Sequence, residues 1–309
     1  MIRNMADETL TSRLTKPQNR RFERFDEENE KQWQGPYCFI QGADTQFGMI
    51  DSYLDHKTEP GWEEEIRLLK IAIGNINKMK PRPRFFVVCG DLVHEFPGSP
   101  YRAAQEKDLK QVFNEIHPDI PLVCVCGNHD VGDSPTPESI QIYKNSFGDD
   151  YFAFTVGGVR YIALNSQFYQ DSSQVPDLKQ EQDDWLDKEL ALYSSARNSD
   201  KQYQHLVIFQ HIPWFLKTPE EENEYFNIDI TVRQKMLEKF HNAGVKTIFC
   251  GHYHRNAGGT YKNMELVVTS AVGAQLGDDR SGLRVVKVLE HSIEHDYVAV
   301  EDIPADVVL

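Results

Sequence analysis

The sequence lacks the features that mark secreted, membrane and nucleic-acid-binding proteins. Its five cysteines include no C-x-x-C pair, which argues against a disulfide-bonded domain and a four-cysteine zinc site. No apolar run approaches the roughly 20 residues that span a bilayer, so we expect no membrane partner. Asp and Glu outnumber Lys and Arg by 48 to 33, and the formal net charge of -15 disfavours nucleic acid as a partner.

The amino-terminal segment is polar and carries no recognisable targeting signal. Residues 1–22 contain no apolar stretch of the signal-peptide kind, and Asp7 and Glu8 argue against a transit peptide. We therefore expect a cytoplasmic protein. Residues 1–35 are predicted to form a polar N-terminal arm, and residues 36–309 a single domain.

Beyond the arm, short apolar runs alternate with segments of helical periodicity. Helices are predicted over 62–79, 102–116, 178–194 and 231–243. The alternation predicts an α/β fold. The ten apolar runs given next are hard to bury in one sheet, so we expect two stacked sheets flanked by helices. Strands are predicted at 37–41, 84–89, 121–126, 151–156, 159–165, 205–210, 245–250 and 264–270, with two more within 283–300.

Polar side chains follow five of the predicted strands at the point where each strand ends. Loops at the carboxyl ends of strands carry the sites of α/β proteins, and glycine lets the backbone turn sharply there. Five such endings in order are hard to explain by packing alone. The five segments are Asp44-Thr45-Gln46, Gly90-Asp91, Gly127-Asn128-His129-Asp130, His211 and Gly251-His252-Tyr253-His254.

The donor atoms in these segments are oxygens and imidazole nitrogens, without a thiolate. This mixture suits divalent ions such as Mn, Fe or Zn. Seven donors are too many for one catalytic ion with an open position, so the pattern predicts two ions that share a bridging carboxylate. The candidate ligands are Asp44, Gln46, Asp91, Asn128, His211, His252 and His254.

The order of these motifs resembles that of the calcineurin-like metallophosphoesterase superfamily over about residues 37–290. The phrases GADTQFG, NSQFY, QHIPWF and GHYHRNAGGTY are more closely similar to the calcineurin-like phosphoesterase domain-containing protein 1 group. That group is described as cytoplasmic serine/threonine protein phosphatases that act on a growth-signalling kinase of the Akt type. The resemblance implies a four-layer α/β/β/α sandwich with two mixed sheets.

The same resemblance implies a role for each motif residue. Asp91 is the implied bridge between the metals, and His129 the implied proton donor with Asp130 orienting it. Gln46 stands where the family usually has histidine, which leaves the identity and occupancy of the first metal open. The implied first-metal ligands are Asp44 and His254, and the implied second-metal ligands are Asn128, His211 and His252.

The resemblance further implies a phosphomonoester hydrolase with two divalent ions (Mn, Fe, Zn or Mg). A hydroxide that bridges the ions would attack the phosphate of a phosphoserine or phosphothreonine protein, and His129 would protonate the leaving group. One alternative is hydrolysis of a small nucleotide or sugar phosphate. Another is a non-catalytic scaffold, which only Gln46 supports.

Three other features of the sequence bear on the predicted site. Arg255, directly after His254, is a candidate for binding substrate phosphate, although a surface salt bridge would explain it equally well. His94, three residues after Asp91, is interpreted as a histidine outside the site, with a supporting position next to the ligands as the alternative. The cysteines that precede glycines of the metal motifs are expected to be inert, with oxidation that distorts the site as the alternative. They are Cys89, Cys126 and Cys250.

Overall fold

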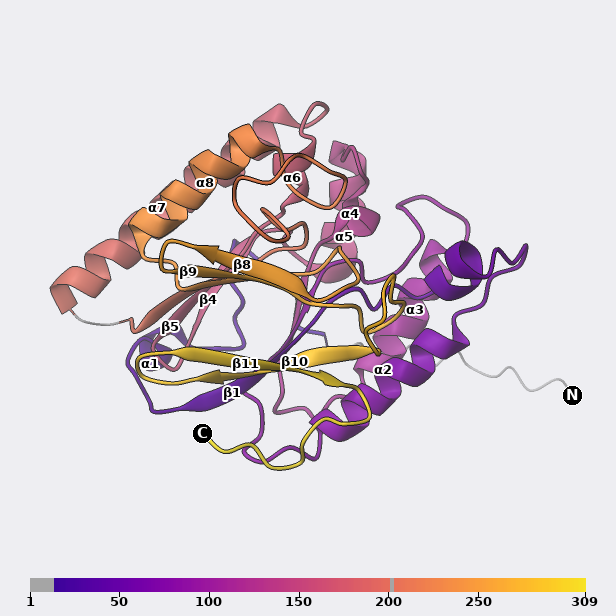
Figure 1. Cartoon of the computed structure of the whole chain (residues 1–309), viewed down its shortest axis with the longest axis horizontal. Coiled ribbons are helices and arrows are strands. Elements are labelled where there is room, and N and C mark those ends of the chain that lie inside the picture. The colour runs from indigo at the N-terminus through magenta and orange to yellow at the C-terminus, as the bar shows by residue number, and fades with distance from the viewer. Residues whose placement is uncertain (1–13, 201–202) are drawn as a thin grey trace, which may run out of the picture.

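The computed structural model describes residues 14–200 and 203–309 as two stacked β-sheets with helices on both outer faces (Figure 1). One sheet has five strands in the order β11-β10-β1-β2-β3, and the other has six in the order β4-β5-β6-β7-β9-β8. Parallel and antiparallel pairs occur in both sheets. The predicted four-layer sandwich with two mixed sheets is therefore confirmed.

The element bounds follow the predicted apolar runs and helical segments. The strands are β1 (Tyr37–Gly42), β2 (Phe86–Cys89), β3 (Leu122–Val125), β4 (Phe152–Val156), β5 (Val159–Ala163), β6 (His205–Phe209), β7 (Thr247–Cys250), β8 (Ala257–Tyr261), β9 (Met264–Val268), β10 (Gly282–Val288) and β11 (Ile293–Ala299). The helices are α1 (Glu27–Glu30), η1 (Ile50–Leu54, a π-helix), α2 (Glu63–Ile76), α3 (Arg102–Phe113), α4 (Asn128–Val131), α5 (Pro137–Phe147), α6 (Gln167–Gln170), α7 (Pro176–Asp200) and α8 (Ile230–Ala243). Across both described ranges, no helix combines the length and the apolarity needed to cross a bilayer.

Apart from the helices of four or five residues (α1, η1, α4 and α6), two regular elements of the structure were not predicted. Strand β8 has the sequence AGGTY, in which two glycines remove the usual strand signal, and it pairs only with β9 at the sheet edge. Helix α5 begins after Thr136, whose side chain accepts a hydrogen bond from the Ser139 amide, and Pro137 occupies its first turn. The start signal of α5 was therefore present in the sequence, whereas β8 depends on its partner strand.

An aromatic layer fills the space between the two sheets. The rings of Phe39 and Phe85 on one sheet stack at 4.6 Å, and those of Tyr161 and Phe209 on the other stack at 5.5 Å. Phe39 also meets Tyr161 edge-on at 5.7 Å across the gap. Because these contacts join β1 to β5 and β6, they hold the strand ends of the two sheets beside one another.

Residues 14–36 pack along the outer edge of the six-stranded sheet. Phe22 is buried and lies against the rings of Phe152 and Phe154 on the edge strand β4. Farther along, the Glu30 carboxylate accepts a hydrogen bond from the Gly157 amide in the β4–β5 turn at 2.6 Å. This segment therefore covers a sheet edge that would otherwise expose unpaired backbone and aromatic side chains.

Replacing Phe22 tests whether this segment contributes to the core. We expect Phe22→Ala to lower the free energy of unfolding by about 3–5 kcal/mol, because the truncation leaves a cavity between aromatic rings. Urea-induced unfolding measures the change. The exposed Ile142 provides the control, and Ile142→Ala is expected to change stability by no more than about 0.5 kcal/mol. Equal effects of the two variants would contradict a packed role for residues 14–36.

Candidate metal centre

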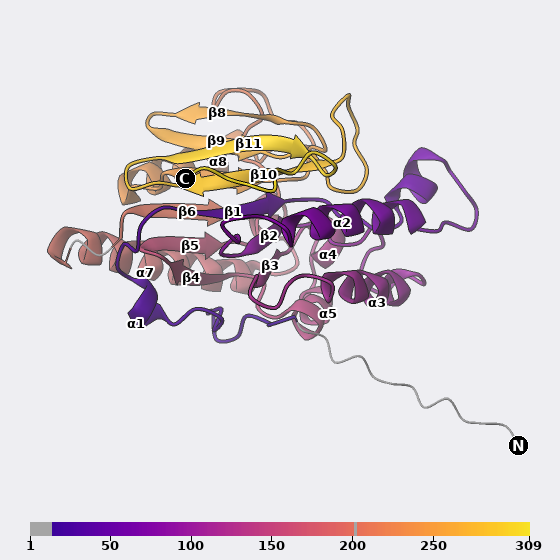
Figure 2. The same ribbon diagram turned by 90° about the horizontal axis from the view of Figure 1, so that it is seen from below.

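The five predicted motif segments meet at one end of the sandwich. Strands β1, β2 and β3 are parallel in one sheet, as are β6 and β7 in the other, and the loops after them gather at the same end (Figure 2). All seven predicted ligand residues are buried. The carboxylate and imidazole atoms of five of them form two groups. Asp91 groups with His211 and His252, and Asp44 groups with Asp91 and His254. Within each group, the potential ligand atoms all lie within 4.8 Å of one another.

Asp91 belongs to both groups and lies at the middle of the cluster. Its Oδ2 is 3.2 Å from His211 Nε2, and its Oδ1 accepts a hydrogen bond from the His129 amide at 2.9 Å. The same His211 Nε2 lies 3.1 Å from Asn128 Oδ1. Asn128 is held in turn by Asp133, which accepts a hydrogen bond from its Nδ2 at 2.9 Å.

Asp44 forms the second half of the cluster. Its Oδ1 lies 3.2 Å from His254 Nε2 and 4.0 Å from His211 Nε2. Its Oδ2 accepts a hydrogen bond from the His252 amide at 3.0 Å. Asp44 therefore joins the end of β1 to the loop after β7, and hence one sheet to the other.

Each of the three histidines directs one ring nitrogen to a backbone carbonyl. This bond fixes the ring and leaves the other nitrogen as an acceptor, which is the usual arrangement of metal-binding histidine. The pairs are His211 Nδ1 with Cys89 O at 2.8 Å, His252 Nε2 with Tyr225 O at 3.3 Å, and His254 Nδ1 with Ala274 O.

Several residues of the cluster have positive φ angles, a backbone conformation that residues other than glycine rarely adopt. Such strain is concentrated at functional sites, where the surrounding structure must enforce it. Of the nine positive-φ residues other than glycine in the described chain, five are predicted ligands. These are Asp44 (52°), Gln46 (36°), Asp91 (50°), His252 (70°) and His254 (52°).

Two motif positions must be glycine, because the backbone there passes too close to predicted ligands to leave room for a side chain. A Cβ on Gly90, whose φ is +85°, would lie 2.3 Å from His211 Nδ1. A Cβ on Gly127 would lie 2.2 Å from Asp91 Oδ1. Both distances are far below van der Waals contact, so any other residue here would displace a predicted ligand.

The charges of the cluster are mutually dependent. Burial disfavours ionised Asp91, but His211 and His129 outweigh it and lower the pKa of Asp91 well below its usual range. Burial likewise disfavours charged His211, whereas Asp91 raises the pKa of His211 to about 9. Burial beside His211 lowers the pKa of His252 to about 3. The buried carboxylates thus demand a positive partner, and the donor set fits divalent cations.

Gln46 lies next to the cluster, where its backbone N–H donates a hydrogen bond to the Asp91 carbonyl at 3.0 Å. Its Nε2 is 3.5 Å from His94 Nδ1. Its Oε1 is buried without a hydrogen-bond partner among the residues that the structure describes. A buried oxygen of this kind is costly unless something binds it, so Gln46 also fits a role as an oxygen donor to a metal.

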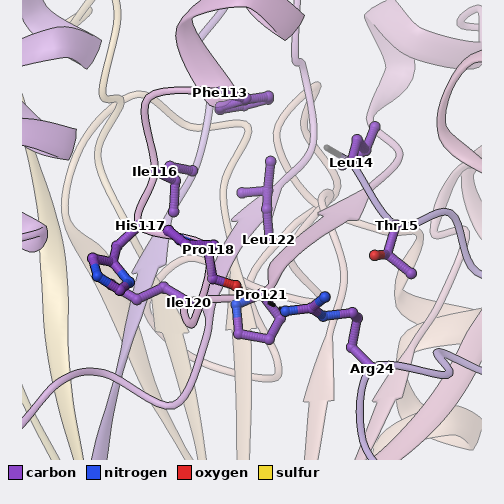
Figure 3. Close-up of a pocket in the computed structure, with 10 residues that line it drawn as sticks. All are labelled: Leu14, Thr15, Arg24, Phe113, Ile116, His117, Pro118, Ile120, Pro121 and Leu122. Carbon is purple, nitrogen blue, oxygen red and sulfur yellow. Dashed lines mark hydrogen bonds between the residues drawn. The ribbon is translucent and has the colours of Figure 1, made fainter. Parts of the chain in front are cut away.

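A pocket of about 490 Å³ opens over the cluster. It is lined by Gln46, Met49, Tyr53, Asp91, His94, Phe96, Asn128, His129, Asp133, Tyr225, Phe226, His252, His254 and Leu276. A second pocket, of about 270 Å³, lies at the amino end of β3 and includes Arg24, His117 and Leu122 (Figure 3). The two pockets share no lining residue, and only the first contains predicted ligands.

His129 is held in this pocket by its neighbours in the β2–α3 loop. Its ring lies between His94, at 4.9 Å, and Phe96, at 4.5 Å, with interplanar angles of 28° and 23°. Its Nδ1 contacts the His94 carbonyl oxygen. The interpretation of His94 as a histidine outside the site is therefore wrong, because it lines the pocket and stacks on the predicted proton donor.

Asp130 does not orient the His129 ring. Its carboxylate accepts hydrogen bonds from the Gly127 amide at 2.8 Å and the Leu92 amide at 3.2 Å, and Arg102 Nη2 lies at 3.4 Å. Arg102 Nη1 also donates to the carbonyls of Glu95 at 2.7 Å and His129 at 2.8 Å. The buried Arg102–Asp130 pair thus joins the β2–α3 loop, which carries His94, to α4, which carries His129, and it acts on backbone rather than on the imidazole.

Arg255 lies beside the pocket and does not line it. Its guanidinium is 4.9 Å from the centre of the Tyr253 ring, and its Nη1 is 3.3 Å from the Tyr253 carbonyl oxygen. The residues that line the pocket and that the sequence analysis missed include Phe96, Asp133 and Tyr225. None of them stands in a motif, and only the fold brings them to the cluster.

The three cysteines before the motif glycines are buried. Burial raises the pKa of Cys89, Cys126 and Cys250, so their reactive thiolate forms are disfavoured. This environment favours the interpretation of inert packing residues.

Family comparisons agree with the fold and the site. The sequence profile of calcineurin-like phosphoesterases matches residues 43–256, more than half of the chain, and the chain belongs to this family of metal-dependent phosphoesterases. Among curated relatives, serine/threonine-protein phosphatase CPPED1 of Bos taurus is 50% identical over 287 residues, covering 92% of this chain and 90% of the relative. The Danio rerio protein of the same name is 45% identical over 301 residues, covering 96% and 95%.

Solved structures share the fold at low sequence identity. A dimetal phosphatase from Danio rerio superposes with a TM-score of 0.62 at 16% identity, covering 85% of this chain and 96% of that one. Purple acid phosphatase PPD1 from yellow lupin gives a TM-score of 0.57 at 12% identity, covering 88% of this chain and 52% of that one. These similarities concern the architecture alone.

Replacing Arg102 tests its role in joining the β2–α3 loop to α4. We expect Arg102→Met to lower the free energy of unfolding by about 3–5 kcal/mol, because it removes the cation that pairs with the buried Asp130 and Glu106 carboxylates. The exposed Arg67–Glu64 pair supplies a matched control, and Arg67→Met should cost no more than about 1 kcal/mol. Urea-induced unfolding distinguishes the two, and similar losses would show that the buried pair has no special role.

Proposed function

We propose that this protein is a metal-dependent serine/threonine protein phosphatase whose substrates include a growth-signalling kinase of the Akt type. The observation that carries the proposal is the pair of carboxylate–imidazole groups joined at Asp91, in a pocket that also contains His129. The names of the curated relatives support the phosphoprotein as substrate. The proposed location is the cytoplasm, in agreement with five cysteines that are all free.

We assign seven residues to the two metals. Asp44, His254 and the Gln46 oxygen would hold the first ion, Asn128, His211 and His252 the second, and Asp91 would bridge them. Two divalent ions (Mn, Fe, Zn or Mg) supply Lewis-acid stabilisation of phosphate charge and a water of lowered pKa at this position. Their charge also outweighs that of the two carboxylates, so a phosphate dianion is attracted to this pocket of an acidic protein.

His129 is the proposed proton donor to the leaving serine or threonine oxygen. Contact of its Nδ1 with the His94 carbonyl oxygen makes Nδ1 the protonated nitrogen. Because Nδ1 keeps its proton in this contact, the ring would donate as the imidazolium, which carries a second proton on Nε2 and becomes neutral imidazole when that proton moves to the leaving oxygen. Stacking of the ring on Phe96 and His94 fixes the direction in which Nε2 points. A general acid needs a fixed direction, because a misplaced donor accelerates the reaction little.

The first test is phosphate release from a phosphoserine peptide. Chelator-stripped protein should be inactive and should regain activity with Mn, Mg, Zn or Fe added singly. Asp91→Asn should abolish release, because it removes the carboxylate that both ions share. Asp119→Asn, at an exposed surface position, is the control and should retain activity.

No release with any metal, from folded protein that binds metal, would contradict the proposed function. Turnover of a nucleotide or sugar phosphate by the same preparation would then identify a small-phosphoester hydrolase. Absence of all turnover would leave the scaffold as the explanation.

The role of His129 predicts a dependence on the leaving group. His129→Gln should lower kcat for a phosphoserine peptide by about 10²–10⁴-fold, because an alkoxide leaves poorly without a proton. The loss should be far smaller for p-nitrophenyl phosphate, whose leaving group is stable as an anion. His117→Gln in the second pocket, which shares no lining residue with the first, should change neither rate. An equal loss on both substrates would contradict proton donation.

A further inference from the structure

Aromatic side chains that solvent reaches surround the mouth of the metal-centre pocket. Tyr53 from η1, Phe96 from the β2–α3 loop and Tyr225 from the β6–α8 loop all line it. Their exposed fractions are 55%, 36% and 58%. Nine large hydrophobic side chains are exposed in the described part of the chain, so a third of them lie at this single opening. Such concentration marks a surface that contacts something else.

The exposure of Tyr53 is imposed by a well-anchored turn. The buried Glu65 carboxylate of α2 accepts hydrogen bonds from the Gly48 amide at 3.1 Å and the Ile50 amide at 2.9 Å. Ser52 Oγ donates to the Gly48 carbonyl at 2.6 Å. The turn therefore holds Tyr53 outward at the pocket, and its neighbour Leu54 is exposed as well.

The charges at the mouth select against acidic neighbours of the phosphate. No lysine or arginine occurs among the described residues that line the pocket. The acidic residue Asp133 lines the pocket, and its carboxylate accepts a hydrogen bond from the side-chain Nδ2 of Asn128. Beyond the phosphate itself, the pocket lining thus offers aromatic surface and negative charge, while Arg255, outside the lining, packs against the Tyr253 ring.

We propose that Tyr53, Phe96 and Tyr225 form a docking rim for an apolar or aromatic side chain next to the phosphorylated residue. The inference rests on the proposed phosphatase function and names its substrate class. A phosphate seated beside Asn128 and His129 places the next residue one Cα step, about 3.8 Å, along the chain, at the edge of the same pocket. An apolar side chain there covers exposed rings, and an aspartate meets Asp133.

The test compares three phosphoserine peptides that differ only in the residue after phosphoserine, which is Phe, Gly or Asp. We expect metal-loaded protein to prefer the Phe peptide over the Gly peptide by about tenfold in kcat/KM, and to turn over the Asp peptide least. The preference should appear mainly in KM, because the rim contact is made before and during reaction.

Tyr53 is the position to vary, because the rings of Phe96 and Tyr225 lie against His129 and His252. Tyr53→Ser should reduce the Phe-to-Gly ratio to about twofold, whereas Tyr53→Phe, which keeps the ring, should preserve it. Leu192 on α7 is exposed to 65%, and Leu192→Ser serves as the control that should leave the ratio unchanged.

Each other outcome overturns the proposal in a recognisable way. Equal turnover of the three peptides, or a full preference in Tyr53→Ser, overturns the rim and leaves the phosphatase intact. Hydrolysis of adenosine monophosphate in preference to every peptide, weakened by Tyr53→Ser, would mean that the rings stack on a base instead. No turnover of any peptide by protein that cleaves p-nitrophenyl phosphate would refute the proposed function itself.

Discussion

The burial of Asp44 and Asp91 is the constraint on which the rest of the site depends. Two carboxylates inside a protein are unfavourable unless positive charge accompanies them. The surrounding histidines meet this demand in part, as the pKa of His211, which Asp91 raises to about 9, indicates. Divalent cations meet it fully. The buried carboxylates of the cluster therefore need cations beside them. Cations at this position are also what the hydrolysis of a phosphate ester requires.

The fold meets this constraint by placing the carboxyl ends of strands from both sheets next to one another. Stacked rings such as Phe39 and Tyr161 hold the strands of both sheets side by side, so five strand ends open into one space. The short loops that follow can reach the cluster only in left-handed backbone conformations, which Asp44, Asp91 and the final histidines adopt. Packing far from the site thus maintains strained geometry within it.

The chemistry of the site extends beyond the ligands to the residues that hold them. Arg102 joins the carbonyls of Glu95 and His129, and the carbonyl of Tyr225 accepts from His252. Phe96 stacks on His129 with one face while part of its surface remains exposed. The proposed substrate contact and the proposed proton donor are therefore connected through a single side chain.

Much of this could be predicted from the sequence, because strands buried on both faces must be apolar and metal ligands must be Asp, Asn or His. The apolar runs predicted ten strands, and the polar residues after five of them, together with a family resemblance, predicted seven candidate ligands. Strand β8 was missed because its glycines carry no strand signal and its stability comes from pairing with β9. Asp130 was assigned to His129 by resemblance, yet its carboxylate turned out to pair with Arg102.

By itself, the sequence determined the class of fold and the kind of atoms at the site, since both follow from residue type and order. Tertiary structure alone decided which non-ligand residues surround those atoms. His94, Phe96 and Tyr225 are ordinary loop residues in the sequence, and nothing in their local pattern sets them apart. They gain a role because loops separated by up to about 130 positions meet over one pocket, and such proximity arises from packing of the whole chain.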